Sequence, residues 1–266
     1  MSNIFDIKRF WNFFLYDLRR ARNNYAVSML LIGLLPILVF VITEFFSLIT
    51  GNGITELPNE VKWVALAVGC LVVLLGFGSR VYGLLTEKRA GSDYLMIPAS
   101  TLEKWLSLLL VNCVAAPIVL FVLYYLSDGI AGLLFPNSYG ERIFATIQDA
   151  RIFDTMAQEG LIVNFPGIMI LNWVINILTF TLGAICFKRA KVAKTLLCVF
   201  GLSMVLSTLL AVFAGTGNID PEWLASHFDS PQRAVSALNW YLNITSFGIL
   251  ALLFGGIYYR LRTIQH

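Results

Sequence analysis

The sequence predicts an all-α integral membrane protein with six transmembrane helices, an amphipathic helix ahead of them and both termini in the cytoplasm. Three observations lead to this prediction. The 266 residues are 58% hydrophobic and only 13% charged, whereas soluble domains carry about 25% charged residues. Six apolar runs are each long enough to cross a bilayer, which takes about 20 residues. The basic residues gather in alternate connections between these runs.

The six apolar runs are each bounded by charged or turn-forming residues, and we expect them to form one transmembrane domain over residues 26–266. Pro36 and Pro117 lie inside the first and third runs, where neighbouring helices satisfy the carbonyl groups that a kink frees. Arg80 lies near the end of the second run and reaches the headgroups from there. The runs are residues 26–48, 62–84, 105–126, 167–187, 194–215 and 236–258.

The distribution of charge fixes the expected orientation, because basic residues are retained on the cytoplasmic side. With the N-terminus inside, 15 of the 19 Lys and Arg residues are inside, but only 5 of the 16 Asp and Glu residues. The basic residues left outside are Lys62, Arg142, Arg151 and Arg233. The acids placed inside are Asp6, Asp17, Glu87, Asp93 and Glu103.

Residues 1–25 carry the pattern of a basic amphipathic helix, which we expect over residues 4–24. Ile7, Phe10, Trp11, Phe14 and Leu18 recur at spacings of three and four, and most basic residues fall elsewhere. Such a helix lies in the membrane interface, either as a general anchor or with a mechanical role. The stretch is too long and too mixed in charge for the start of a cleavable signal peptide. No eukaryotic targeting signal is evident either, so the bacterial inner membrane is the simplest expected location.

Two connections are long and are expected on the outer side, at residues 127–166 and 216–235. The first contains a stretch that reads as helical over residues 141–158, and the second contains a short helix expected over residues 221–228. Asp220 is suited to cap that helix and Pro221 to be its first residue. Both helices are expected to pack on the bundle as caps.

The sequence lacks the motifs of several enzyme classes, so we expect no catalytic residue, metal or cofactor on this chain. It has no phosphate-binding loop of the Gly-x-x-x-x-Gly-Lys-Ser/Thr type. The histidines are His227 and His266, which cannot pair on one helix face to hold zinc. Ser79 has no histidine to act as its base. The four cysteines lie in apolar runs without paired spacing and are expected to serve as packing residues.

Three asparagines lie within the predicted spans. Asn112 is in the third span, and Asn172 and Asn176 share one face of the fourth. Buried amides in a membrane often join helices by hydrogen bonds, and a substrate path is the alternative reading. Ionisable residues deep in the spans are scarce, whereas ion-driven carriers need them. The energy source is therefore expected to lie on another chain.

Residues 86–105 form a polar connection between the second and third runs, on the cytoplasmic side. A short helix is expected from Ser92, with Gly91 permitting the turn into it and Pro98 ending it. Ser100 and Glu103 have the spacing of a capping box, which starts the next helix. The apolar side chains between them are expected to be exposed and to form a docking knob; they are Tyr94, Leu95, Met96 and Ile97.

The polar connection resembles the segment after the second span in permease subunits of type-2 ABC exporters. In that family a Glu-Arg/Lys…Gly stretch leads to a short apolar helix, then Pro-x-Ser-x-x-Glu and the third span. The motif match covers about twenty residues, and the wider arrangement of helices agrees. The matching residues are Glu87, Arg89, Gly91, Leu95, Pro98, Ser100 and Glu103.

The resemblance implies a permease subunit that pairs with a second permease subunit, identical or related, and docks on a separate ABC-type ATPase. ATP would bind to that partner. Residues 91–97 would be the coupling helix within the loop 87–104, and residues 4–24 the connecting helix. The implied coupling residues are Glu87, Arg89, Gly91, Tyr94, Leu95, Met96, Pro98, Ser100 and Glu103. Here the longest outer loop follows the third span, whereas many family members enlarge the loop before the last span. The sequence does not identify the substrate.

The alternative function is a membrane scaffold or sensor that docks another cytoplasmic protein through the same loop. Lys88, Arg89, Lys188, Arg189 and Lys191 would suit an acidic ATPase surface, and the retention of positive charge inside explains them equally. Nothing in the sequence points to nucleic acid. A copurifying ATPase separates the two functions.

Overall fold

The computed structural model describes residues 5–51, 56–87, 91, 94, 96–145, 165–213 and 231–265, and every regular element within them is a helix. The first half contains α1 (Ile7–Gly33), α2 (Leu35–Thr50), α3 (Asn59–Val81) and the 3₁₀ turn η1 (Gly83–Thr86). It continues with α5 (Thr101–Leu110), the π-helical turn η2 (Val111–Ala115), α6 (Ala116–Leu134) and α7 (Pro136–Tyr139). The second half contains α10 (Phe165–Cys186), α11 (Lys191–Phe213) and α13 (Pro231–Gln265).

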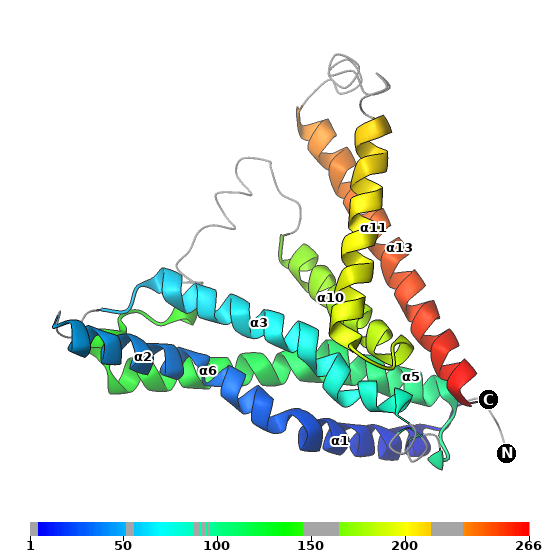
Figure 1. Cartoon of the computed structure of the whole chain (residues 1–266), viewed down its shortest axis with the longest axis horizontal. Coiled ribbons are helices and arrows are strands. Elements are labelled where there is room, and N and C mark those ends of the chain that lie inside the picture. Colours follow the sequence, from blue (N-terminus) through cyan, green and yellow to red (C-terminus); the bar gives the residue numbers. More distant parts are fainter. Residues whose placement is uncertain are drawn as a thin grey trace.

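The helices form two arms that meet at one end (Figure 1). In the first arm α1, α2, α3 and α6 lie side by side, and in the second arm α11 runs beside α13. Helix α10 lies between the arms and packs against α3, α11 and α13. Helix α5 lies where the arms meet and packs against α1 and α13. The buried core therefore occupies the junction and the first arm, while α11 is almost entirely exposed.

The apolar helices confirm a multi-pass membrane architecture. Within the described residues four helical runs are long and apolar enough to cross a membrane. They are Asn59–Thr86, Thr101–Leu134, Lys191–Leu209 and Trp240–Ile264. Helices α1 and α2 qualify together as a fifth crossing, with a bend of 46° between them. Helix α10 contributes a shorter apolar run, Ile170–Cys186, so the sixth crossing stays a prediction.

The bend between α1 and α2 lies where the sequence places a proline. Pro36 is in the first turn of α2 and Leu34 ends α1, and a proline is suited to that first turn because its missing N–H has no partner there. The sequence analysis expected a separate helix over residues 4–24 and a span from residue 26. Instead α1 runs without a break from Ile7 to Gly33.

The expected apolar stripe of the N-terminal helix divides between two faces. Ile7 and Trp11 are 72% and 56% exposed, whereas Phe10 is buried and Phe14 packs partly against the core. The row that faces the bundle is Phe10, Phe13, Asp17, Ala21 and Tyr25. This row follows the helical repeat as well as the expected one does, and the contact with α5 selects it.

The third span is longer than the sequence suggested. The helical run continues to Leu134, eight residues beyond the predicted end at residue 126. The reason is that Asp128, which resembles the start of a loop, is buried and accepts a hydrogen bond of 2.7 Å from the Tyr139 hydroxyl. Only the first turn of the helix expected over 141–158 is described, and the helix expected over 221–228 lies outside the described residues.

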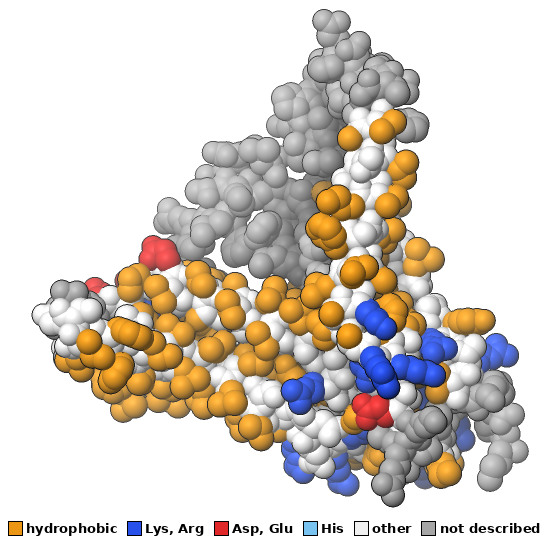
Figure 2. Space-filling view, in the orientation of Figure 1, with side chains coloured by type: hydrophobic (Ala, Val, Ile, Leu, Met, Phe, Trp, Pro, Cys, Tyr) orange, Lys and Arg blue, Asp and Glu red, His pale blue; other side chains and the backbone are white. Residues whose placement is uncertain are grey.

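The charged residues bracket a layer of membrane thickness. Lys62 and Arg80 are 18 residues apart on α3, which at 1.5 Å per residue is about 27 Å, close to the hydrocarbon core of a bilayer. Figure 2 shows Lys and Arg side chains gathered at the end of the molecule where the chain termini lie in Figure 1, with an acidic side chain among them and further acidic side chains towards the far end of the first arm. This separation agrees with the predicted orientation, in which the end rich in Lys and Arg faces the cytoplasm.

A buried lysine holds the outer end of the first arm together. The Lys62 ammonium donates hydrogen bonds to the backbone carbonyls of Tyr139 and Glu141, the second at 2.7 Å, and lies 4.3 Å from the centre of the Tyr139 ring. The Tyr124 hydroxyl donates to the Lys62 carbonyl at 3.1 Å. These bonds join α3, α6 and α7, so the charge that the sequence places at the outer boundary is also a structural tie.

The junction between α3 and α10 depends on a close approach of two backbones. A side chain at Gly78 would place its Cβ 2.5 Å from Thr181 Oγ1 and 3.0 Å from Thr181 Cα. Thr181 in turn donates a 3.3 Å hydrogen bond to Asn112 in η2. Small residues that let helices approach in this way are common in membrane proteins.

We predict that Gly78→Ala destabilises the protein by about 1–3 kcal/mol, because the new methyl group forces α3 away from α10. Thermal unfolding in detergent measures the effect. Gly201→Ala on α11 is the matched control, since nothing lies within 4 Å of its Cβ position, and it should leave the unfolding temperature unchanged or raise it. Equal effects of the two substitutions would contradict the close-approach account.

Candidate functional site

The described residues of the polar connection fit the short helix that its sequence predicts. Gly91 and Tyr94 are helical, as is Met96, and the chain is no longer helical from Pro98 to Ser100. The Gly91 amide donates to the Glu87 carbonyl at 2.9 Å. A Cβ at Gly91 would lie 2.6 Å from the Leu85 carbonyl oxygen, so glycine is required there. Arg89, Ser92 and Leu95 lie outside the described residues.

The predicted capping box is present and starts α5. Ser100 Oγ accepts a hydrogen bond from the Glu103 amide at 3.2 Å, and Glu103 Oε2 accepts one from the Ser100 amide at 2.8 Å. Both free amides at this helix start are thereby paired. The geometry confirms the sequence signal, and it also fixes where the polar connection ends.

Glu103 holds α1 as well as the start of α5. Arg9 binds its carboxylate through two nitrogens, Nε at 2.8 Å from Oε2 and Nη2 at 2.7 Å from Oε1. The Asp6 amide donates to Oε1 at 2.9 Å. The Glu103 side chain is fully buried, and a two-point guanidinium contact is the strongest geometry for such a pair. One carboxylate therefore joins the first turn of α1 to the polar connection.

Tyr94 is buried, which corrects the prediction that it forms part of an exposed knob. Its ring packs edge-on against Phe13 at 5.5 Å between centroids. The Arg20 guanidinium lies 4.7 Å from the ring centre and the Lys104 ammonium 5.6 Å. Aromatic rings attract cations at these distances, so the ring turns inward. Met96 remains 81% exposed and Ile97 is partly buried, which leaves Met96 as the exposed apolar residue of the described knob.

A buried carboxylate lies beside this ring. Asp17 Oδ2 accepts hydrogen bonds from the Tyr82 hydroxyl at 2.7 Å and from Ser107 Oγ at 2.9 Å. Tyr82 follows α3 and Ser107 is on α5, so Asp17 joins α1 to both. We call the group the Tyr94 cluster; it comprises Asp17, Arg20, Tyr82, Tyr94, Lys104 and Ser107.

The Tyr94 cluster retains unused hydrogen-bonding capacity. Asp17 Oδ1, Arg20 Nη1 and the Tyr94 hydroxyl are buried without a hydrogen-bond partner among the described residues. Burial raises the pKa of the Tyr94 phenol well above its ordinary value, and the Asp17 carboxylate raises it further. The phenol is therefore neutral at physiological pH, and the contacts with Arg20 and Lys104 join cations to a neutral ring.

The remaining predicted coupling residues are at the edge of this arrangement. Glu87 is half exposed and lies 3.5 Å from the Lys191 ammonium, at the start of α11. Pro98 is exposed and separates the knob from the capping box. Sequence reasoning missed Arg9, Asp17 and Tyr82. A signal was available for Asp17, because it falls in the same helical row as Phe13 and Ala21.

The three asparagines of the possible substrate path do not meet in one place. Asn112 is buried within η2, donates to the Leu108 carbonyl at 2.8 Å and accepts from Thr181. Asn172 and Asn176 are exposed on α10, where the Asn176 amide donates to the Asn172 carbonyl at 2.8 Å. Asn112 thus joins α10 to the π-helical turn. Of the two roles considered for the asparagines, helix joining and a substrate path, this contact corresponds to the first.

The candidate site supplies charged and hydrogen-bonding side chains, and its contacts join α1 to α5 and to Tyr82 after α3. No three His, Cys, Asp or Glu side chains converge in the described part of the chain to hold a metal ion. Comparison with protein-family models, with curated proteins and with solved structures finds no match. The geometry and the sequence motif therefore carry the functional argument.

We predict that Asp17→Leu destabilises the protein more than Asp17→Asn does. Leucine leaves the Tyr82 and Ser107 hydroxyls buried without an acceptor, at about 1–3 kcal/mol for each. Asparagine keeps one acceptor oxygen. Thermal unfolding in detergent compares the two variants, and an equal loss for both would show that the hydroxyl contacts do not stabilise the fold.

We also predict that Arg9 and Glu103 are energetically coupled. A double-mutant cycle with Arg9→Met and Glu103→Gln, read by thermal unfolding, should give a favourable interaction energy because the carboxylate is buried. The matched cycle with Lys191→Met and Glu87→Gln should give an interaction energy near zero, because that carboxylate is half exposed. Similar values in the two cycles would contradict the assigned role of Glu103.

Proposed function

We propose that this chain is the membrane-spanning permease subunit of an ATP-driven ABC transporter, that it works as an exporter, and that loop 87–104 couples it to a separate ATPase subunit. The observation that carries the proposal is the arrangement of the polar connection. Met96 is 81% exposed, while Tyr94 and Glu103, on either side of it in the sequence, are held against α1. Such a knob is suited to be displaced by a cytoplasmic protein and to transmit that displacement to the spanning helices.

The transmission follows from the contacts of two residues. A displacement of the knob moves Tyr94, which packs against Phe13 of α1. The same displacement moves Glu103, which is bound to Arg9 at the start of α1. Asp17 joins this part of α1 to Tyr82 and Ser107. Helices α1, α3 and α5 would therefore move as a unit when the ATPase closes.

The exposed second arm supports the expected pairing with a second permease subunit. Helix α11 carries large apolar side chains on all sides and buries almost none of them. A helix of this kind meets either lipid or another protein. On this proposal ATP binds the partner ATPase, this chain itself catalyses no reaction, and the complex lies in the bacterial inner membrane.

The test of the partner is copurification. The protein is solubilised from its native membrane, captured through a terminal tag, and its companions are identified by mass spectrometry. A stoichiometric ATPase with a phosphate-binding loop is the expected result. Stoichiometric recovery of another cytoplasmic protein without an ATPase would replace the transporter by the scaffold or sensor, which would use the same knob.

We predict that Met96→Asp weakens the binding of the ATPase to the permease. A charge on the knob should prevent its docking in an apolar groove, so the purified complex should lose at least about tenfold in ATPase association, equivalent to 1.4 kcal/mol. Met96→Leu keeps the apolar surface and Asn12→Asp adds a charge to an exposed site on α1; both should retain binding. Unchanged association in Met96→Asp would remove the knob from the interface.

A further inference from the structure

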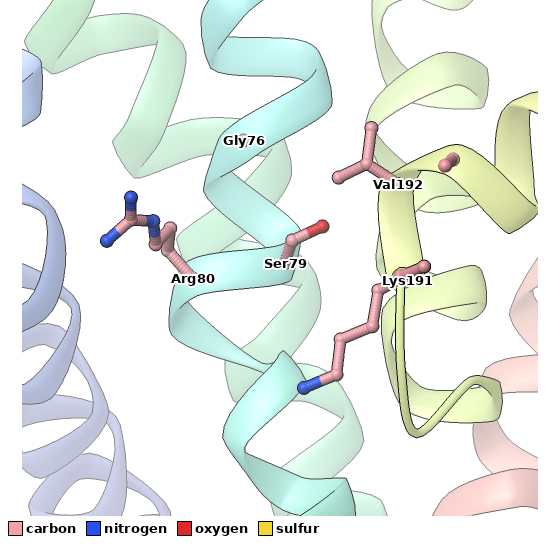
Figure 3. A pocket seen from close by; sticks show the side chains of 7 residues that line it. Gly76, Ser79, Arg80, Lys191 and Val192 are labelled. Atoms are coloured by element: carbon pink, nitrogen blue, oxygen red, sulfur yellow. The ribbon is translucent and has the colours of Figure 1, made fainter.

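A shallow cavity, largely open to its surroundings, lies between the inner end of α3 and the start of α11. Its volume is about 370 Å³ and it is lined by Gly76, Ser79, Arg80 and residues 190–193. In Figure 3 Ser79 and Val192 face the gap between the two helices, while Lys191 reaches back to the end of α3. Arg80 leaves the other side of α3, so cationic side chains stand on both sides of this helix end.

The surroundings of the cavity are strongly basic. The Lys191 ammonium donates to the Gly83 carbonyl at 2.6 Å and lies 3.5 Å from the Glu87 carboxylate. The other cations near the helix ends are exposed, and Figure 2 shows a group of basic side chains in the region where α11 begins. They are Arg80, Lys188, Arg189 and Lys194. Glu87 offsets the charge of one cation, and the rest favour a negatively charged ligand.

The cavity lies at the inner boundary of the membrane and opens beside apolar surface. Arg80 is the charge that marks this boundary on α3, about 27 Å from Lys62 by helical rise. Further along α11, Leu197 and Phe200 are 73% and 63% exposed, and α11 diverges from α3 in that direction (Figure 1). A ligand that fits has an anionic head at the cavity and apolar chains along α11.

We propose that this cavity binds the phosphate headgroup of an anionic phospholipid of the inner leaflet. Basic pockets between helices on the cytoplasmic side recognise such headgroups. Ser79 supplies a hydroxyl and Lys191 a positioned ammonium, Arg80 adds positive charge from the other side of α3, and the acyl chains lie against α11. The proposal concerns a face of the protein separate from the docking knob, and it stands independently of the proposed transport function.

The experiment titrates delipidated protein in neutral detergent with phosphatidylglycerol, phosphatidylcholine or glycerol 3-phosphate, and native mass spectrometry counts the bound lipid. Phosphatidylglycerol should bind most tightly. The double variant Arg80→Gln/Lys191→Gln should bind it about 25-fold more weakly, at about fivefold for each cation removed. Glutamine at position 191 retains a donor for the Gly83 carbonyl. Ser79→Phe, which fills the cavity without changing the charge, should also lose phosphatidylglycerol.

The matched control is Arg19→Gln/Arg22→Gln, which removes two exposed cations from α1 and should change phosphatidylglycerol binding less than about twofold. An equal loss in both double variants would overturn the proposal, because it would show an unspecific response to total charge. Binding of phosphatidylcholine as tight as that of phosphatidylglycerol would also overturn the proposal. So would effective competition by glycerol 3-phosphate, which has no acyl chains. A dimer that excludes lipid from this face would be a third contrary result. If the double variant fails to fold, the Ser79→Phe variant decides the question. Phosphatidylglycerol binding that is retained in Ser79→Phe would then overturn the proposal.

Discussion

The buried carboxylate of Glu103 is the constraint on which the inner end of the molecule depends. It completes the capping box that starts α5, binds the guanidinium of Arg9 and accepts the amide of Asp6. An ionised group with no exposure is tolerated only when its oxygens are fully paired, and here the partners come from the start of α1 and from the end of the polar connection. The start of α1, the polar connection and α5 are consequently set in position by one side chain. The Tyr94 cluster extends this arrangement to α3.

The fold was largely predictable because a membrane imposes strong rules on sequence. Apolar length predicts crossings and basic residues predict orientation, and these rules identified the long helices and the charged boundaries at Lys62 and Arg80. They could not place the end of the third span, because Asp128 looks like a loop residue until its partner Tyr139 is known. They also could not select which of two overlapping apolar rows of α1 faces the bundle.

The candidate site was predictable where its chemistry is local. The Ser100–Glu103 box and the requirement for glycine at position 91 follow from spacing over a few residues. The inward turn of Tyr94 and the pairing of Arg9 with Glu103 depend on contacts 74 and 94 residues apart along the chain, which no local pattern contains. The local spacing therefore predicted the capped start of α5, while the structure shows that Met96 is exposed and Tyr94 is buried.

The π-helical turn η2 has a consequence for the register of the third span. One row of buried positions on this span recurs every four residues; its members are Lys104, Leu108, Asn112, Ala116, Leu120, Tyr124 and Asp128. Four residues of α-helix overshoot a full turn by about 40°, so an uninterrupted α-helix would carry this row around to the lipid. The wider turn at Val111–Ala115 takes up part of the overshoot. The row therefore stays buried along the whole span, from Lys104 near the knob to Asp128 at the outer tie.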